Sequence, residues 1–341
     1  MQGSKFRQIS CCKSLHPYRT GLNNRSVCVC YPNRPDLFHT SCFGDVGHTD
    51  GCSVINGKFF AGEGETMKVC VFGANGYVGA SVYQLLKETP DADVVGTYLE
   101  NPAVFNDLDK LDINQPESFS AFYKQTQPDV VVWSVMNGPY EDELIHEGLT
   151  HLITHITPQT KLVYVSSDFV FTEGNGPYDE DAPMSKLPED HKLSTYANAK
   201  VKAEYFISKE LSNYVILRAG PIYGKNKIGK LDERTDQLKY QLRSGSTVAY
   251  RDDLIRTFVH IDDLANVVTE FVQNNVTGVY HAGPDKRYSF YEFMQQIAEQ
   301  LGYHKDLVEK ASEHEEADEE IPKNTSLKTE KIANVMKQTF R

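Results

Sequence analysis

The sequence predicts an α/β protein: a doubly wound parallel sheet covered by helices, with a smaller lobe toward the C-terminus. Short apolar runs of strand length alternate with stretches of helical period, which is the pattern of a buried parallel sheet. A glycine-rich turn joins the first apolar run to the first helical stretch, and polar residues follow later runs. We expect one domain over residues 67–341, with 67–224 mainly in the sheet and 225–335 mainly in the lobe.

The first 66 residues do not follow this pattern. They mix Asn, Arg, Gly, Ser, Pro and Cys without a sustained period, and we expect a disordered or non-native extension. Six of the seven cysteines lie there, while the rest of the chain keeps Cys70. Their spacing lacks the paired C-x2-C units of common zinc sites, so no metal is expected. The residues weighed as ligands are Cys28, Cys30, His39, Cys42, His48 and Cys52.

Composition favours a globular protein without nucleic-acid or membrane contacts. The chain has 341 residues, 40% of them hydrophobic, and a formal charge of −12. Residues 1–66 hold seven Lys and Arg against five Asp and Glu, and the remainder holds 28 against 42. An acidic body repels a phosphate backbone, and no apolar run approaches the ~18 residues that cross a bilayer. A body nearly free of cysteine suits a reducing compartment, so we expect a cytoplasmic protein.

Residues 67–88 have the pattern of a strand, a glycine turn and a helix. The apolar run MKVCVF leads into GANGYVG, and ASVYQLLKE follows with helical period. Gly73 permits a tight turn, Gly76 lets the backbone approach a phosphate, and Gly79 lets the helix pack closely on the strand. The helix N-terminus then offers N–H groups to a pyrophosphate. This predicts a Rossmann-type dinucleotide site, which also includes these residues of the turn: Asn75, Tyr77 and Val78.

The strand after this helix ends without the acidic residue that usually binds the ribose 2′-hydroxyl of NAD. Thr97 and Tyr98 stand there, Glu100 is a displaced carboxylate, and no arginine replaces it. NAD and NADP therefore both stay open, with NADPH slightly favoured. Asp112 either accepts a hydrogen bond from the adenine amino group or caps the next helix, and Ile113 is expected to pack on the adenine ring.

Two later segments carry side chains suited to proton transfer. Residues 161–167 (KLVYVSS) form a strand with Ser167 at its carboxyl end, where ligands of open α/β sheets bind. The helical stretch 195–210 places Tyr196 and Lys200 four residues apart on one face. A neighbouring ammonium lowers the pKa of a phenol, and a serine hydroxyl can polarise a carbonyl. Together they predict protonation of a carbonyl that accepts a hydride.

These and further motifs occur in one order along the chain. They are GANGYVG at 73–79, VYVSSDFVF at 163–171, GPYDEDAP at 176–183, YANAK at 196–200, LRAGPIYG at 217–224, RTFVHIDDLA at 256–265, YSFYEFMQQIAEQLG at 288–302 and NTSLKTEKI at 324–332. The chain resembles the extended short-chain dehydrogenases/reductases, and among them the dTDP-4-dehydrorhamnose reductase-like family. The resemblance implies a seven-stranded parallel sheet and a lobe that closes over a nucleotide-sugar.

The resemblance also implies roles for individual residues. Tyr196 is the general acid, Lys200 lowers its pKa and binds the nicotinamide ribose, and Ser167 positions the substrate carbonyl. Pro221 and Ile222 are expected to lie against the nicotinamide. These roles are transferred only at matching positions, because a shared fold does not establish a substrate.

The chain departs from the family pattern in two places. Segment 137–160 is shorter, and Ile145 or His146 stands near the place of an Asn that completes the family's proton relay. At the substrate end, Asp168 and Arg256 are expected to contact the substrate beside Ser167. A charged loop offers further partners for a nucleotide phosphate: Lys227, Lys230 and Arg234.

We therefore expect an NAD(P)H-dependent reductase that delivers hydride to the keto group of a nucleotide-activated deoxysugar. A second interpretation is a catalytically weak NADP-binding regulatory subunit that resembles the beta subunit of methionine adenosyltransferase. The short segment 137–160 favours this interpretation, and the presence of Ser167, Tyr196 and Lys200 opposes it. A third is a nucleotide-sugar epimerase or dehydratase, which retains its cofactor through the cycle. The oligomeric state stays open, a homodimer included.

Overall fold

The computed structural model describes residues 27–28, 40–41, 66–100, 102–311, 321–337 and 339–341. The chain divides into two compact units, Met1–Gly51 and Cys52–Arg341. In the first unit, β1 (Val27–Cys28) and β2 (Thr40–Ser41) pair antiparallel. The side chains weighed as zinc ligands lie outside the described part of the chain.

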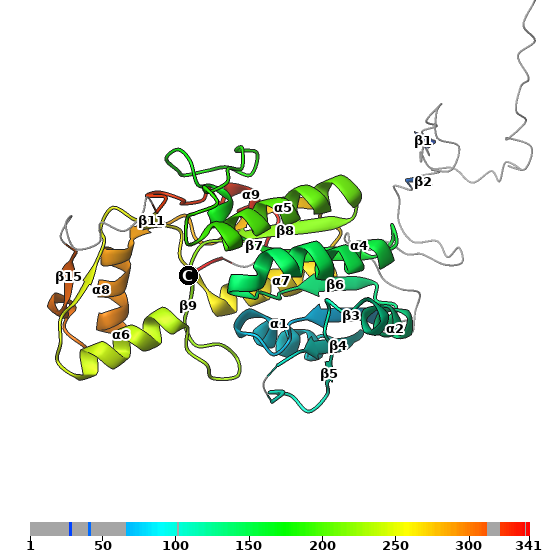
Figure 1. Ribbon diagram of the computed structural model, residues 1–341, viewed down its shortest axis with the longest axis horizontal. Coiled ribbons are helices and arrows are strands. Elements are labelled where there is room, and N and C mark those ends of the chain that lie inside the picture. The colour runs from blue at the N-terminus through cyan, green and yellow to red at the C-terminus, as the bar shows by residue number, and fades with distance from the viewer. Residues whose placement is uncertain (1–26, 29–39, 42–65, 101, 312–320, 338) are drawn as a thin grey trace, which may run out of the picture. The chain divides into compact units, whose positions relative to one another are not determined.

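Seven parallel strands form the central sheet, in the order β13-β8-β7-β6-β3-β4-β5 (Figure 1). The order reverses between β3 and β6, which makes their carboxyl ends the topological switch point of the sheet. This confirms the predicted doubly wound fold. The bounds are β3 Met67–Phe72, β4 Ala92–Tyr98, β5 Leu108–Lys110, β6 Val130–Trp133, β7 Lys161–Ser167, β8 Tyr214–Ala219 and β13 Gly278–Ala282.

Helices cover both faces of this sheet, as the two apolar cores show. Helices α1 (Tyr77–Lys87) and α7 (Ile261–Gln273) pack on one face. Helices α2 (Pro116–Thr126), α4 (Thr150–His155) and α5 (Ser194–Glu210) pack on the other. Between β6 and α4, the short helix α3 (Glu141–Glu143) runs without a break into a π-helical segment, η2 (Leu144–Leu149).

A smaller lobe has its own apolar core, with Phe258 stacked on Phe293 at 3.7 Å between ring centroids. It contains α6 (Glu233–Arg243) and α8 (Phe290–Gln300), with β10 (Val248–Tyr250) paired to β15 (Val308–Lys310) and β11 (Ile255–Arg256) paired to β14 (Tyr288–Ser289). Ser289 and Glu292 form a capping box that fixes the start of α8. The 3-10 helix η4 (Lys305–Leu307) also packs on the core of the lobe. The short helix α9 (Glu330–Ala333) lies outside the lobe, with its residue Ile332 in one core of the sheet.

Chain segments far apart in sequence join the lobe to the sheet. Strand β9 (Ile222–Tyr223), just after β8, pairs in parallel with β12 (Val259–His260), just before α7. The segment 322–327 runs past both parts, with a bridge between Ile255 and Asn324 and another between Tyr178 and Leu327. The lobe is therefore attached through at least three separate stretches of backbone.

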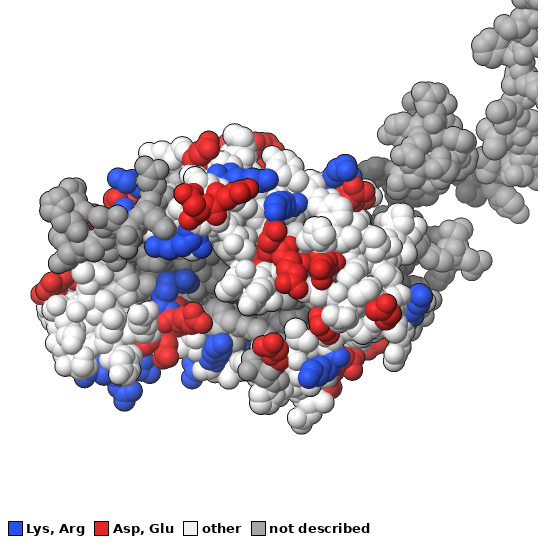
Figure 2. Space-filling view, viewed as in Figure 1, with Lys and Arg blue, Asp and Glu red and all other residues white. Residues whose placement is uncertain are grey.

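Figure 2 shows acidic and basic side chains interspersed over the viewed face, without one continuous basic surface. Within the described residues, none of the helices is both long and apolar enough to cross a membrane.

Candidate active site

The glycine turn packs so tightly that side chains have no room. A Cβ on Gly79 would lie 2.1 Å from the Gly73 carbonyl oxygen and 2.6 Å from Ser134 Oγ. Gly73 has φ +82°, a left-handed conformation that favours glycine. Gly76 is the N-cap of α1 and offers no side chain to the first N–H groups of the helix. These groups stay available for an anion, so the turn fits a dinucleotide pyrophosphate.

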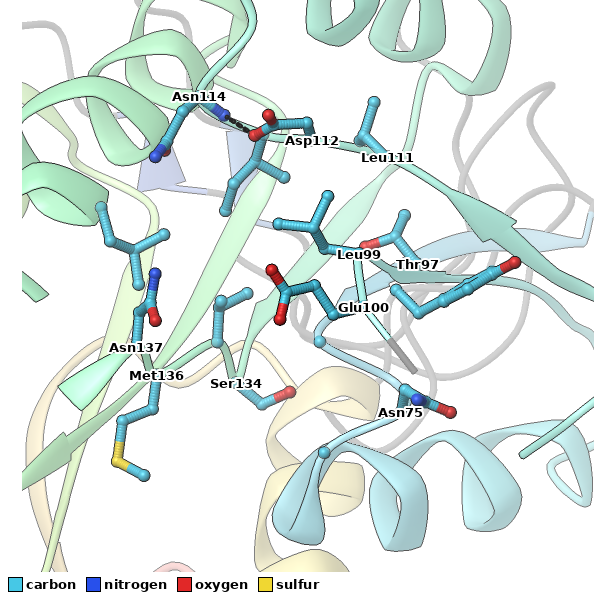
Figure 3. Close-up of a pocket in the computed structure, with 16 residues that line it drawn as sticks. Asn75, Thr97, Leu99, Glu100, Leu111, Asp112, Asn114, Ser134, Met136 and Asn137 are labelled. Atoms are coloured by element: carbon cyan, nitrogen blue, oxygen red, sulfur yellow. Dashed lines mark hydrogen bonds between the residues drawn. The ribbon is translucent and has the colours of Figure 1, made fainter. Parts of the chain in front are cut away.

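A pocket of ≈ 270 Å³ opens at this turn (Figure 3). Its wall contains six of the residues predicted to bind the cofactor, and Figure 3 shows Glu100 pointing among them. The 16 lining residues include two carboxylates, Glu100 and Asp112, and no Lys or Arg. The six predicted residues are Gly73, Asn75, Gly76, Thr97, Asp112 and Ile113.

Asp112 does not cap the helix that follows. Its Oδ1 accepts a hydrogen bond from the backbone N–H of Asn114 at 3.0 Å, and the N-cap of α2 is Gln115, without a side-chain cap. The carboxylate still lines the pocket. Of the two roles that the sequence left open for Asp112, the structure thus excludes capping of the helix. Adenine recognition stays a prediction for Asp112 and Ile113.

Two residues of the glycine turn hold neighbouring loops. Asn75 Oδ1 accepts from the N–H of Val104 at 2.7 Å, and Tyr77 Oη donates to the carbonyl of Gly224 at 2.7 Å. Asn226 Nδ2 in turn donates to the carbonyl of Tyr77 at 3.0 Å. The start of α1 is thus fastened to the chain that leads into the lobe.

The predicted catalytic residues come together at the carboxyl end of β7. Ser167 Oγ donates to Asp168 Oδ1 at 3.2 Å and accepts from the N–H of Phe169. It also lies near enough to Tyr196 to lower the pKa of that phenol, and Lys200 Nζ lies 5.6 Å from the centroid of the Tyr196 ring. Desolvation raises the pKa of Tyr196; Lys200 and Ser167 lower it, while Glu141 and Asp168 raise it further. The net shift is upward, opposite to the sequence-based expectation, because desolvation outweighs the ammonium.

Glu141 was missed by the sequence reasoning. Its side chain is fully buried, and its Oε1 lies 2.7 Å from Lys200 Nζ. His146, the residue weighed for a proton relay, is exposed in η2. The sequence did contain a sign that Glu141 is buried. Leu144, Ile145 and Leu149 follow it at i+3, i+4 and i+8, the spacing of one helix face, and all three are buried.

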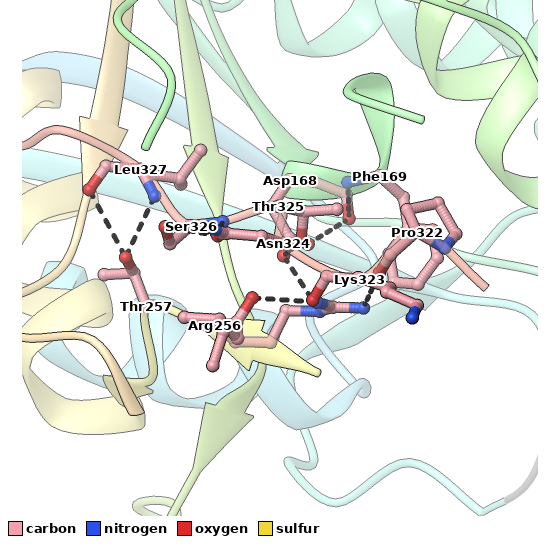
Figure 4. Close-up of polar contacts among 12 residues, drawn as sticks. Asp168, Phe169, Arg256, Thr257, Pro322, Lys323, Asn324, Thr325, Ser326 and Leu327 are labelled. Atoms are coloured by element: carbon pink, nitrogen blue, oxygen red, sulfur yellow. Dashed lines mark hydrogen bonds and ion pairs between the residues drawn. The ribbon is translucent and has the colours of Figure 1, made fainter. Parts of the chain in front are cut away.

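Asp168 and Arg256 form part of a buried polar cluster (Figure 4). Arg256, 1% exposed, donates to the carbonyls of Ile255, Pro322 and Lys323 at 2.7–2.9 Å. Its Nε lies 3.8 Å from Asp168 Oδ2, which also accepts from Thr325 Oγ1 (Figure 4).

All of these contacts are made with protein groups. The guanidinium therefore holds the C-terminal segment, rather than standing free at a surface. Substrate contact by Asp168 and Arg256 stays a prediction.

The remaining predicted residues lie between sheet and lobe. Pro221 and Ile222 sit at the β9–β12 pair, where the carbonyl of Pro221 accepts from the N–H of Val259. In the charged loop, Lys227 Nζ lies 4.0 Å from Asp262 Oδ1, and Arg234 donates to the carbonyl of Ile222. Phosphate binding by Lys227, Lys230 and Arg234 is not tested by these contacts. Among the residues that the structure describes, no group of three His, Cys, Asp or Glu side chains could hold a metal.

The fold and the site together define the class of extended short-chain dehydrogenases/reductases, which confirms the resemblance seen in the sequence. The family model described as the RmlD substrate binding domain matches residues 146–341, and the chain belongs to that family.

Named relatives of the chain differ in function. It is 24% identical over 268 residues to an ADP-L-glycero-D-manno-heptose-6-epimerase of Brachyspira hyodysenteriae, covering 68% of this chain and 80% of the relative. It is 23% identical over 248 residues to methionine adenosyltransferase 2 subunit beta of Xenopus laevis, covering 68% and 71%. The dTDP-4-dehydrorhamnose reductase of Bacillus anthracis, solved in complex with NADP, superposes with TM-score 0.66 at 19% identity, covering 81% of this chain and 95% of that one.

Proposed function

We propose that the protein is an NAD(P)H-dependent reductase that acts on the keto group of a nucleotide-activated deoxysugar. One observation carries the proposal: Ser167, Tyr196 and Lys200 lie together at the carboxyl end of β7, with Lys200 Nζ 5.6 Å from the centroid of the Tyr196 ring. The glycine turn, where Cβ atoms would collide with backbone, supports a bound dinucleotide beside them. Membership of the RmlD family supports the sugar-nucleotide class of substrate.

The side chains divide the chemistry between them. A bound nicotinamide supplies a hydride to the keto carbon. Tyr196 Oη donates its proton to the carbonyl oxygen, which becomes the product hydroxyl, and Ser167 Oγ donates a hydrogen bond to that oxygen. Lys200 stabilises the tyrosinate until it regains a proton from solvent. The raised pKa of Tyr196 keeps the phenol protonated at pH 7, as an acid in the reductive direction requires.

The charge of the pocket favours NADH over NADPH. Glu100 points into it, and no Lys or Arg is among its lining residues. A carboxylate hydrogen bonds a ribose 2′-hydroxyl but repels a 2′-phosphate. The lining of the pocket therefore opposes the slight preference for NADPH expected from sequence.

Titration followed by substitution tests the proposal. We expect NADH to bind the purified protein more tightly than NADPH in isothermal titration, and keto-sugar nucleotides to be reduced. Tyr196→Phe keeps the ring and removes the acid, so turnover should fall by a factor of about 10² or more with cofactor affinity unchanged. Unchanged turnover in this variant would sink the assignment.

A regulatory subunit is the second candidate function. The match to methionine adenosyltransferase 2 subunit beta and the altered segment 137–160 favour it. It predicts a stable complex with a methionine adenosyltransferase catalytic subunit in size-exclusion chromatography, and no turnover of any keto-sugar nucleotide. A reductase gives the reverse of both results.

The match to a heptose-6-epimerase supports a third candidate, an epimerase or dehydratase that regenerates its own cofactor. Such an enzyme keeps the nicotinamide through purification. Absorbance at 260 and 340 nm after denaturation would reveal a retained cofactor.

A further inference from the structure

Lys200 carries a positive charge in an almost solvent-free setting. Its side chain is 3% exposed, and its Nζ meets Glu141 Oε1 at 2.7 Å and Tyr164 Oη at 3.4 Å. Its Nζ also lies 5.6 Å from the centroid of the Tyr196 ring. Desolvation raises the pKa of both phenols, so both are neutral at pH 7. Neutral phenols do not balance a buried ammonium, which leaves that task to Glu141.

Other carboxylates around the site already have partners. Asp168 and Glu204 act on Tyr196 and Tyr164 through space. Glu204, however, accepts three hydrogen bonds from the guanidinium of Arg218, and Asp168 accepts from Thr325 and faces Arg256. Among the described residues, Glu141 is therefore the carboxylate in direct contact with Lys200.

The second oxygen of Glu141 connects this pair to the cofactor pocket. Its Oε2 accepts a hydrogen bond from the backbone N–H of Asn137 at 2.7 Å. Asn137 lines the pocket that contains the glycine turn. One carboxylate thus holds both the lysine and a piece of the pocket wall.

We propose that Glu141 is a positioning residue that fixes the charge and direction of the Lys200 ammonium toward the nicotinamide ribose. The inference rests on the proposed function only in that Lys200 meets a bound dinucleotide. It does not require reduction of any particular sugar.

The groups around Lys200 set the expected pH behaviour. Burial alone lowers the pKa of a lysine, while attraction to Tyr164, Glu141 and Tyr196 raises that of Lys200 above its usual value. Because both phenols are neutral at pH 7, Glu141 is the one of these three partners that is charged there. With Glu141→Gln the hydrogen-bonding shape is kept and the charge is lost, so burial prevails and Lys200 gives up its proton at lower pH.

Cofactor affinity measured against pH tests this proposal. We expect the dissociation constant for NADH of the unaltered protein to stay nearly constant from pH 7 to 9.5. In Glu141→Gln it should rise about tenfold over the same range, as for loss of one proton from the binding form. Glu143→Gln removes a neighbouring exposed charge of the same helix and should match the unaltered protein. Glu141→Asp should restore the flat profile with somewhat weaker binding.

Several outcomes would overturn the proposal. If the dissociation constant of Glu141→Gln for NADH does not change with pH, the positioning role is wrong and the reductase assignment is unaffected. If that constant changes with pH as expected but the unaltered protein reduces no substrate, the reductase assignment is wrong and the positioning role stands. Absence of NADH and NADPH binding by the unaltered protein removes both.

Unfolding of the cofactor-free protein gives a further readout, which also serves if Glu141→Gln folds poorly. We expect Glu141→Gln to lower the denaturation midpoint, because it leaves the Lys200 ammonium buried without a counter-charge. The double variant Glu141→Gln/Lys200→Met should recover most of that loss, because the buried ammonium is no longer present. No recovery in the double variant would contradict the pairing.

Discussion

Gly79 shows how one residue sets the distance between a helix and a strand. Because Gly79 has no side chain, the first turn of α1 packs directly against the glycine turn that precedes it. The carbonyl oxygen of Gly73 lies only 2.1 Å from the position that a Cβ of residue 79 would take. The contact is with backbone, which cannot rotate away as a flexible side chain can. Glycine is therefore required there by packing, while at Gly73 it is favoured by the positive φ.

Gly79→Ala should consequently damage both stability and binding. We expect a loss of unfolding free energy of about 3 kcal/mol, at the upper end for overpacking, and loss of NADH affinity as the turn shifts. Denaturant melts and titration measure the two effects. Gly76→Ala is the comparison, since its nearest contact would be 3.2 Å, and it should unfold at a midpoint closer to that of the unaltered protein. Equal destabilisation by both substitutions would contradict this account.

At the scale of elements, sequence predicted the strands well and the segment 137–155 poorly. Strand β3 begins and ends where expected, because a continuous apolar run buried on both faces leaves little choice. The apolar run at residues 129–136 predicts a strand to Met136, but β6 ends at Trp133 and the following residues form the pocket wall. The letters EDE at residues 141–143 do not show that Glu141 is buried, because charge patterns alone do not reveal a partner 59 positions away.

A buried polar network joins α5, β8 and β13. Glu204 of α5 accepts from Arg218 of β8, and Arg218 Nη1 lies 3.3 Å from His281 Nε2 of β13. Burial, with Arg218 adding to it, lowers the pKa of His281 from 6.5 to about 3. Histidine in the unfolded chain keeps its ordinary pKa of ~6.5. Below that pH the unfolded state takes up a proton that the folded state refuses, so stability falls toward pH 3 and is unaffected above ~6.5.

His281→Gln should remove this part of the pH dependence. Between pH 7 and 5 the unaltered protein should lose about 2 kcal/mol more unfolding free energy than the variant, from about 1.4 kcal/mol per pH unit below 6.5. Urea denaturation at the two pH values measures it. His146→Gln, at an exposed position, should behave like the unaltered protein. Parallel losses in all three proteins would show that His281 does not titrate as described.

For the whole molecule, the sheet, both of its cores and the lobe all lie within residues 67–341. The start of the folded part at Met67 stays a prediction from composition and from the apolar run there, since the cysteine-rich start shares no period with the rest. Composition did not predict which contacts attach the lobe to the C-terminal segment. The hydrogen bonds of Arg256 to Pro322 and Lys323 join residues too far apart for any local pattern to predict.

A chain of residues 67–341 should therefore fold alone. We expect its thermal midpoint to lie within about 2 °C of the full chain and its NADH affinity to be unchanged, because the described contacts of the core are retained. Circular dichroism melts and titration are sufficient measurements. Failure of the shortened chain to fold would mean that residues 1–66 are part of the structure.

The contact between Thr325 and Asp168 also has a consequence in time. The two residues are 157 positions apart, so the serine-tipped strand emerges during synthesis long before its last polar neighbour exists. At about 5–20 residues per second, Asp168 waits roughly 8 to 30 seconds on the ribosome for Thr325. Until then Asp168 has no hydrogen bond from Thr325. Chains that end before residue 325 should thus contain every strand of the central sheet but lack the hydrogen bond from Thr325 to Asp168.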